Sequence, residues 1–290
     1  NRSFQKWIDQ EEWSKVTMAI HKEVKENKRK LDDENFKLLL FAENQKTGRA
    51  KYNGILDAYA LLEKYDKQKT LTLESQIDQG YAAEKLGGYK RAKIYYRRAL
   101  KKAPDENIDL ILQLVGELKR LYERSKDHKS LVQIYKRAYG ALKKSSGPKK
   151  ELRTYAYLIG YHQFFHLKQN KNARIWLLRS DGGGTSAQEL QSAYWVAKLD
   201  QLAKKPEIAL KRLKELSGRK ISKKSPLYVQ IHFELGTLFH LKENWDSALR
   251  HFRFAAKASA PEEFKNIQKV AEENAKQIAD YLKSIKASQG

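Results

Sequence analysis

The sequence predicts an all-α protein made of repeated pairs of helices, and three observations lead to this prediction. The chain has 290 residues with only 15 Gly and 5 Pro, and it is rich in Leu, Ala, Lys, Glu and Gln, which favour helices. Apolar residues recur at intervals of three and four in most segments. Two distant stretches, "GYAAEKLGGYKRAKIYYRRALKKAPDE" and "GTLFHLKENWDSALRHFRFAAKASAP", share one spacing of small, aromatic and Pro residues.

This shared spacing has a physical interpretation. Gly80 is followed by Ala92, Tyr96, Ala99 and Pro104 at intervals of 12, 4, 3 and 5. The second stretch gives intervals of 12, 4, 3 and 6 through Gly236, Ala248, Phe252, Ala255 and Pro261. A Gly on a first helix lets a second helix approach, a small residue and an aromatic four residues later face it, and Pro ends the second helix. The intervening "LGGY" and "KENW" predict the turns of two helix pairs.

These residues resemble the tetratricopeptide repeat family, whose unit is a helix–turn–helix of about 34 residues. Three weaker pairs keep the 12, 4, 3 spacing, from Lys119, Tyr161 and Ala197. The anchors at 92, 131, 173, 209 and 248 lie 39, 42, 36 and 39 residues apart, so we expect longer loops or helices than the family unit has. The resemblance implies a right-handed superhelical array of about five such pairs with helical caps.

The predicted organisation has two parts. Residues 1–70 are expected to form an N-terminal helical segment that caps the array, with apolar stripes in "FQKWIDQEEWSKVTMAIHKEV" and "YNGILDAYALLEKY". Residues 71–290 are expected to hold the repeats and a C-terminal capping helix, because the end of a repeat array must cover its apolar face. The alternative for this last helix, "FKNIQKVAEENAKQIADYLKSIK", is dimerisation or contact with a partner.

The net charge of +23 is concentrated in the middle of the chain. Residues 85–150 carry 19 basic and 6 acidic residues, and residues 151–224 carry 15 and 6. Such a zone attracts anionic partners, although basic stripes on helices are often only solvated surface. The candidate basic ridge lies on the second helices of two pairs and comprises Lys90, Lys93, Arg97, Lys101, Lys129, Lys136 and Lys143.

The family resemblance also implies a concave groove lined by the first helix of each pair. Carried over by the anchors, the candidate groove residues are Tyr81, Lys85, Arg120, Arg124, His162, Phe165, His166, Lys198, Thr237 and His240. This mixed, cation-rich set suits an extended acidic or amphipathic peptide. The Asn residues with which one subgroup of the family clamps a C-terminal carboxylate are absent at the matching points.

Other chemistries lack the residues that they need. Without Cys there is no disulfide, thiolate–metal site or Cys nucleophile. His162 and His166 share a helix face and could hold Zn²⁺ or Ni²⁺, but no third ligand is evident, so no metal site and no cofactor are predicted. "DGGGTS" at 181–186 lacks the Lys of a phosphate loop and is predicted to be a turn, with Thr185 or Ser186 capping the next helix. No constellation for catalysis stands out.

The sequence therefore predicts a non-catalytic scaffold or adaptor that binds a protein partner through an acidic or extended segment, in assembly of a larger complex. The alternative is a polyanion-binding module in which residues 85–224 bind nucleic acid, anionic lipid or an acidic envelope polymer. No run reaches the roughly 20 apolar residues of a transmembrane helix. Residue 1 is Asn, which favours a removed signal sequence, and so the bacterial periplasm or cell envelope over the cytoplasm.

Overall fold

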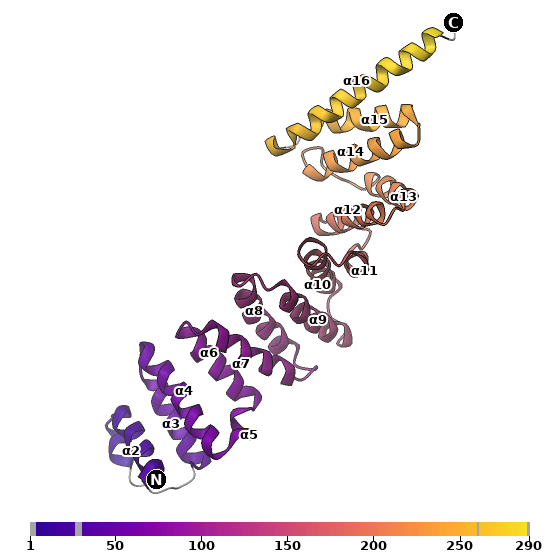
Figure 1. The fold of residues 1–290 in the computed structure, drawn as a ribbon. Coiled ribbons are helices and arrows are strands. Elements are labelled where there is room, and N and C mark those ends of the chain that lie inside the picture. The colour runs from indigo at the N-terminus through magenta and orange to yellow at the C-terminus, as the bar shows by residue number, and fades with distance from the viewer. Residues whose placement is uncertain (1–3, 27–30, 260, 289–290) are drawn as a thin grey trace. The chain divides into compact units, whose positions relative to one another are not determined.

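The computed structural model describes residues 4–26, 31–259 and 261–288, and within these ranges all regular structure is helical (Figure 1). The chain divides into two compact units, residues 1–145 and 146–290. This division follows contacts within the chain and differs from the boundary near residue 70 that the sequence suggests, which remains a prediction. No helix within the described ranges combines the length and the apolarity that spanning a bilayer requires.

The first unit contains nine helices in the part of the chain that is described. They are α1 (Gln5–Asp9), α2 (Trp13–Glu26), α3 (Asp33–Gln45), α4 (Gly48–Tyr65), α5 (Lys67–Thr70), α6 (Leu73–Lys85), α7 (Tyr89–Lys102), α8 (Ile108–Arg124) and α9 (His128–Lys144). Consecutive long helices pack against each other, and within the first unit α6 on α7 and α8 on α9 do so most extensively. The second unit continues the same pattern with α10 (Lys149–Tyr161), the π-helix η1 (His162–His166), α11 (Asn170–Ser180), α12 (Ala187–Leu202), α13 (Pro206–Ser217), α14 (Pro226–Leu241), α15 (Trp245–Ala256), the 3₁₀ turn η2 (Glu262–Phe264) and α16 (Lys265–Ser288).

The turn inside each predicted pair has the same backbone conformation. The residue five positions before each anchor has a positive φ, between 52° and 82°, in all five pairs. These residues are Gly87, Lys126, Lys168, Lys204 and Glu243. Because a positive φ is uncommon outside Gly, its recurrence at one position confirms five repeats, including the three whose sequence pattern is weak.

The close approach of paired helices depends on the Gly residues that the sequence analysis singled out. A Cβ on Gly80 would lie 2.7 Å from the ring of Tyr96, and one on Gly236 would lie 2.7 Å from the ring of Phe252. Both rings are buried, at 2% exposure, and so are Ala92 and Ala248 at the anchors. The small residue on one helix thus makes room for the aromatic on the other.

The third pair departs from the predicted register by one residue. Here Gly160, and not Tyr161, faces the second helix, since a Cβ on Gly160 would lie 2.7 Å from Leu177. In four pairs the residue after the left-handed position donates its N–H to the carbonyl five residues back, whereas Gln169 donates to Gln163, six back. The π-helix at 162–166 accommodates this extra residue within the helix. The extra residue explains why the 12-residue spacing pointed to Tyr161 instead of Gly160.

The ends of the chain pack against their neighbours by apolar stripes. In the first unit Phe4, Val16, Ile20 and Val24 are buried in a cluster with residues of α3 and α4. In the second unit Ala271, Ala275 and Ile278 bury one side of α16 against a core that includes Phe252. The long final helix lies along α15 in Figure 1, and its contacts with α15 are extensive.

Candidate functional site: a cationic and aromatic groove

Four of the predicted groove residues line one cavity in the first unit. Tyr81 and Lys85 come from α6, and Arg120 and Arg124 come from α8. The cavity has a volume of about 540 Å³ and is completed by Glu84, Tyr89, Glu117 and Leu121. We call these eight residues the α6–α8 groove.

Local structure fixes the positions of these side chains. The two residues from each helix are four apart and therefore lie on one face. Opposite faces of the same helices are buried, through Ala82 and Ala83 on α6 and Leu118 on α8. Side-chain caps define where each helix begins, because Thr72 accepts from the N–H of Ser75 at 3.2 Å and Asn107 from that of Leu110 at 3.2 Å.

Arg120 is neutralised within the groove. Its guanidinium forms ion pairs with Glu84 on α6 and with Glu117 one turn earlier on α8. The hydrogen bond from Arg120 to Glu84 is the largest contribution that raises the pKa of the guanidinium. This arginine therefore joins two neighbouring first helices and offers no free charge.

Lys85 and Arg124 are held differently, each against an aromatic ring. The Lys85 Nζ lies 5.1 Å from the centre of the Tyr81 ring, and the Arg124 guanidinium lies 4.2 Å from that of Tyr89. Both side chains are exposed, and neither forms an ion pair with any residue that the structure describes. The rings orient the two cations without cancelling their charge, so the groove presents two positive groups on an aromatic wall.

Tyr81 is itself positioned by a neighbour. The ring of Tyr52 on α4 meets it edge to face, with centroids 5.8 Å apart. A hydrogen bond between the two tyrosines, together with partial burial, raises the pKa of Tyr52. An extended chain with carboxylates could thus contact Lys85 and Arg124 while its apolar groups pack on Tyr81 and Tyr89.

The predicted groove residues of the second unit are arranged less favourably for an anion. Lys198 on α12 forms an ion pair of 2.6 Å with Glu234 on α14, which also accepts from Gln201 at 3.0 Å. Thr237 and His240 line a different cavity of about 450 Å³ with Trp245, Phe252, Asn274, Gln277, Ile278 and Tyr281. This second cavity is aromatic rather than cationic.

The π-helix changes the positions of the three candidate residues in the third pair. His162 is 8% exposed, so it lies beneath the surface, and Tyr161 takes the place that corresponds to Tyr81. Phe165 packs between Tyr161 and Trp195, with ring centroids 4.8 Å from each. His166 is exposed, and its ring lies 5.5 Å from that of His162.

The residues of the candidate basic ridge are also placed by the structure. Six of the seven are exposed, namely Lys90, Arg97, Lys101, Lys129, Lys136 and Lys143. Lys93 turns toward α8, where its Nζ lies 3.2 Å from Ser125 Oγ and 5.6 Å from the Tyr122 ring. Asp105, in the loop between α7 and α8, pairs with Lys144 and Arg137 of α9. Hydrogen bonds from these two side chains lower the pKa of the Asp105 carboxyl to about 2.

The loop at 181–186 is held by specific contacts. Ser186 is the N-cap of α12 and accepts from the N–H of Glu189 at 3.3 Å, while Glu189 accepts from the Ser186 hydroxyl at 2.6 Å. This reciprocal cap confirms the predicted helix start. Asp181 pairs with Arg219 at 2.8 Å and Glu189 with Arg153 at 2.6 Å, so the loop is tied to two other segments of the second unit.

Sequence reasoning missed several residues of both cavities. Tyr89 and Glu117 did not enter the candidate set because the groove was assigned only by fixed positions on first helices. Tyr89 is the first residue of α7, and the left-handed Gly87 turns it toward α8. Trp245 and Tyr281 were missed for a similar reason, although a Trp directly after a predicted turn is a usable signal for a ring at the groove edge.

The fold and the site together define the class of this chain, an all-α repeat protein of stacked, tetratricopeptide-like helix pairs with a groove on the first helices. No protein-family model matches the sequence, and no curated protein matches it.

Comparison with solved structures finds proteins with similar helix pairs, at low sequence identity. The MamA protein is 16% identical, with a TM-score of 0.43 over 68% of this chain and 95% of that one. A kinesin light chain with TPR-like repeats from Podosopora anserina is 13% identical, with a TM-score of 0.43 over 63% and 92%. Yeast Tom70 is 15% identical, with a TM-score of 0.43 over 91% of this chain and 59% of that one. These likenesses concern the fold alone, and the site is described from the chain's own contacts.

Proposed function

We propose that the protein is a non-catalytic scaffold whose α6–α8 groove holds an extended, acidic segment of a partner protein during assembly of a larger complex. The observation that carries the proposal is the pair of uncompensated cations, Lys85 and Arg124, mounted on Tyr81 and Tyr89 in one cavity. Carboxylates that reach both cations make charge-assisted hydrogen bonds in a partly enclosed site.

The shape of the groove supports an extended partner rather than a compact one. Apart from Tyr89, its residues come from two successive first helices of a repeat array, α6 and α8, and such arrays present elongated surfaces to their ligands. The aromatic walls contribute contact area at small entropic cost, because Tyr has few rotatable bonds. Arg120, tied to Glu84 and Glu117, keeps the two helices in register beneath the ligand.

The proposal is tested by placing a photo-crosslinking amino acid at position 81 in the full chain and exposing it to extract of the native host. The matched control carries the same group at Gln133, an exposed position on α9 outside the groove. We expect a discrete product at position 81 that maps to an acidic segment, is absent at position 133, and disappears when Lys85→Glu and Arg124→Glu are added. Equal crosslinking at both positions, or products that persist after the charge reversal, would contradict it.

A further inference from the structure

The outer face of α7 carries an unusual concentration of uncompensated charge. Six of its residues are exposed cations, and the helix contains no acidic residue. These six, the α7 basic face, are Lys90, Arg91, Arg97, Arg98, Lys101 and Lys102. None of them forms an ion pair with a residue in the described part of the chain, whereas α9 shares Asp105 between Arg137 and Lys144.

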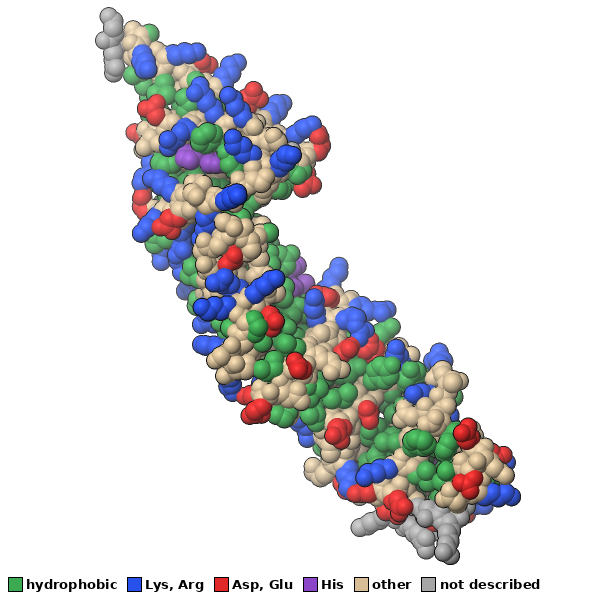
Figure 2. Space-filling model, turned by 180° about the vertical axis from the view of Figure 1, so that it is seen from behind, with side chains coloured by type: hydrophobic (Ala, Val, Ile, Leu, Met, Phe, Trp, Pro, Cys, Tyr) green, Lys and Arg blue, Asp and Glu red, His purple; other side chains and the backbone are tan. Residues whose placement is uncertain are grey.

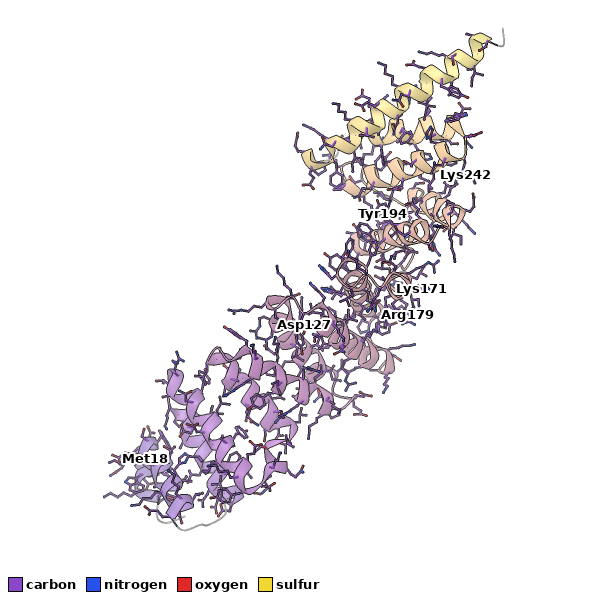
Figure 3. All side chains as sticks on the ribbon, viewed as in Figure 1. Met18, Asp127, Lys171, Arg179, Tyr194 and Lys242 are labelled. Atoms are coloured by element: carbon purple, nitrogen blue, oxygen red, sulfur yellow. The ribbon has the colours of Figure 1, made fainter. Side chains whose placement is uncertain are left out.

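In the second unit, several basic side chains form ion pairs that join neighbouring helices. Asp200 is fully buried and binds Arg174 at 2.6 Å and Arg212 at 2.8 Å, which joins α11, α12 and α13. Lys242, the residue after α14 that is labelled in Figure 3, pairs with Glu207 at 2.6 Å. Arg174, Arg212 and Lys242 therefore have acidic partners that join helices, whereas the six exposed cations of α7 have no ion pair among the described residues.

The α7 basic face is rigid because the other side of the helix is locked in the core. Ala92, Tyr96 and Ala99 are almost fully buried between α6 and α8. Lys93 is drawn away to Ser125, so it does not belong to the face. A fixed helix presents its charges in a constant pattern, which reduces the entropy lost on binding.

That pattern consists of two parallel rows with the same intervals. Lys90, Arg97 and Lys101 are spaced by seven and four residues, and Arg91, Arg98 and Lys102 repeat this spacing one residue later. At about 1.5 Å per residue each row is about 16 Å long. One strand of a duplex places a phosphate about every 3.4 Å along the axis, so each row faces several phosphates.

The composition of the face distinguishes between classes of anionic partner. An amphipathic helix that lies in a membrane interface buries an apolar face in the lipid, and Ile94 is the one exposed apolar residue of α7. Specific protein interfaces have an apolar or aromatic centre, which this face lacks. Single-stranded nucleic acid is held by stacking on exposed aromatics, yet Tyr96 is buried and Tyr95 half-buried. Interfaces with nucleic-acid duplexes are strongly positive and rely on phosphate contacts.

We infer that the α7 basic face is a sequence-independent docking surface for the phosphate backbone of a nucleic-acid duplex, separate from the α6–α8 groove. Apart from Tyr89 at the start of α7, the groove residues lie on α6 and α8, whereas all six cations of the face lie on α7. A partner protein and a duplex can therefore be bound by different side chains, Lys85 and Arg124 in one case and the six cations of α7 in the other.

The test measures binding of a fluorescently labelled 20-base-pair DNA duplex to the full chain by anisotropy, between 50 and 200 mM salt. A triple variant, Arg91→Gln, Arg98→Gln and Lys102→Gln, removes one row. A matched control, Lys205→Gln, Lys211→Gln and Lys220→Gln, removes three exposed cations of the second unit that have no ion pair among the described residues. All substituted side chains are exposed, and melting curves verify that each variant is folded.

We expect the logarithm of the association constant to fall with the logarithm of salt with a slope of about −5 for the wild type, and about −2 to −3 for the triple variant. At 50 mM salt the triple variant should bind at least tenfold more weakly, and the control should stay within about threefold of wild type. Equal weakening in both variants would overturn the assignment to α7. So would a preference for polyglutamate, for anionic vesicles or for single-stranded DNA over the duplex.

Discussion

At the residue scale, the glycines of α6 and α14 set how closely paired helices approach. Gly80 and Gly236 each face an aromatic ring at a distance that leaves no room for a methyl group. Gly116 and Gly140 also lie within helices, but no atom would meet a Cβ on either of them within 4 Å. The same residue type therefore has opposite roles at these positions.

We predict that Gly80→Ala lowers stability and Gly116→Ala raises it. At position 80, overpacking against Tyr96 costs about 1–3 kcal/mol, which outweighs the gain in helix propensity from Gly to Ala. At position 116 nothing opposes that gain, which is about 0.5–1 kcal/mol. Denaturant unfolding of the two variants measures the signs. A stabilising effect at both positions would contradict the close approach of α6 and α7.

Two buried histidines in the second unit provide a second prediction at this scale. His232 on α14 and His251 on α15 share a hydrogen bond, with their Nδ1 atoms 2.9 Å apart, and both are less than 8% exposed. Burial lowers the pKa of each to about 4, and for His251 the neighbouring His232, Arg250 and Lys214 act in the same direction. The neutral imidazoles pack against Tyr228, Phe239 and Phe254.

Stability of this region should fall as pH decreases from about 6.5 to about 4. In that interval the unfolded chain binds protons at both histidines and the folded chain does not, so the free energy of unfolding decreases by about 1.4 kcal/mol per pH unit for each histidine. The double variant His232→Phe, His251→Phe keeps the aromatic packing and removes both sites. Its melting temperature should depend less on pH in this interval, and an unchanged dependence would show that the two histidines bind protons equally in the folded and the unfolded chain.

At the element scale, the left-handed turn in each helix pair carries strain in four of the five repeats. Only the first pair has Gly there, while Lys126, Lys168, Lys204 and Glu243 adopt φ between 52° and 57°. An L-residue in this conformation costs about 1–2 kcal/mol relative to the right-handed form, and Gly does not. The next residue is the N-cap of the second helix, and at Asp127 and Asn244 the side chain accepts a hydrogen bond from the backbone (Asp127 is labelled in Figure 3).

We predict that Lys126→Gly and Lys204→Gly each increase stability, by about 0.5–1 kcal/mol after the greater entropy of the unfolded chain is included. The control is Lys211→Gly in the interior of α13, which should decrease stability by about 1 kcal/mol. Thermal unfolding of the three variants gives the comparison. Loss of stability in all three would mean that the turn positions are not left-handed in solution.

The sequence predicted most of the repeat elements because their signals are local. Gly80, Ala92 and Tyr96 encode a helix pair through spacing alone, and Ser186 with Glu189 encodes a helix start. The π-helix at 162–166 was not predictable in this way, since "HQFFH" fits an α-helix equally well and the extra residue is detected only through Gly160 and Gln169. This single insertion explains why His162 was expected in the groove and is buried.

At the scale of the whole molecule, some Lys and Arg side chains form ion pairs between helices, and others lie on the surface without an ion pair among the described residues. Lys and Arg side chains are spread over helices of both units on the face drawn in Figure 2, in keeping with the net charge of +23. The sequence predicted a basic zone but could not tell which cations have partners. Pairing depends on residues about 26–39 positions apart, such as Asp200 with Arg174, Glu234 with Lys198 and Asp105 with Lys144.

In the candidate site, too, the sequence predicted the cations but not their ion-pair partners. The family resemblance, carried over by the anchors, implied one groove with Tyr81, Lys85, Arg120 and Arg124, and these four residues line one cavity. Only the contacts show that Arg120 is neutralised by Glu84 and Glu117 while Lys85 and Arg124 remain uncompensated. A groove with two oriented cations is a narrower proposal than the cation-rich surface that the sequence suggested.

The measurement that tests the central claim most directly is calorimetric titration of the full chain with an extended peptide of alternating Asp and Leu. The account predicts binding that weakens at least tenfold in Lys85→Glu, Arg124→Glu and changes by less than about threefold in Lys129→Glu, Lys143→Glu, which makes the same charge change on exposed α9 positions outside the cavity. Equal weakening in both double variants, or none in the first, would contradict the proposed role of the α6–α8 groove.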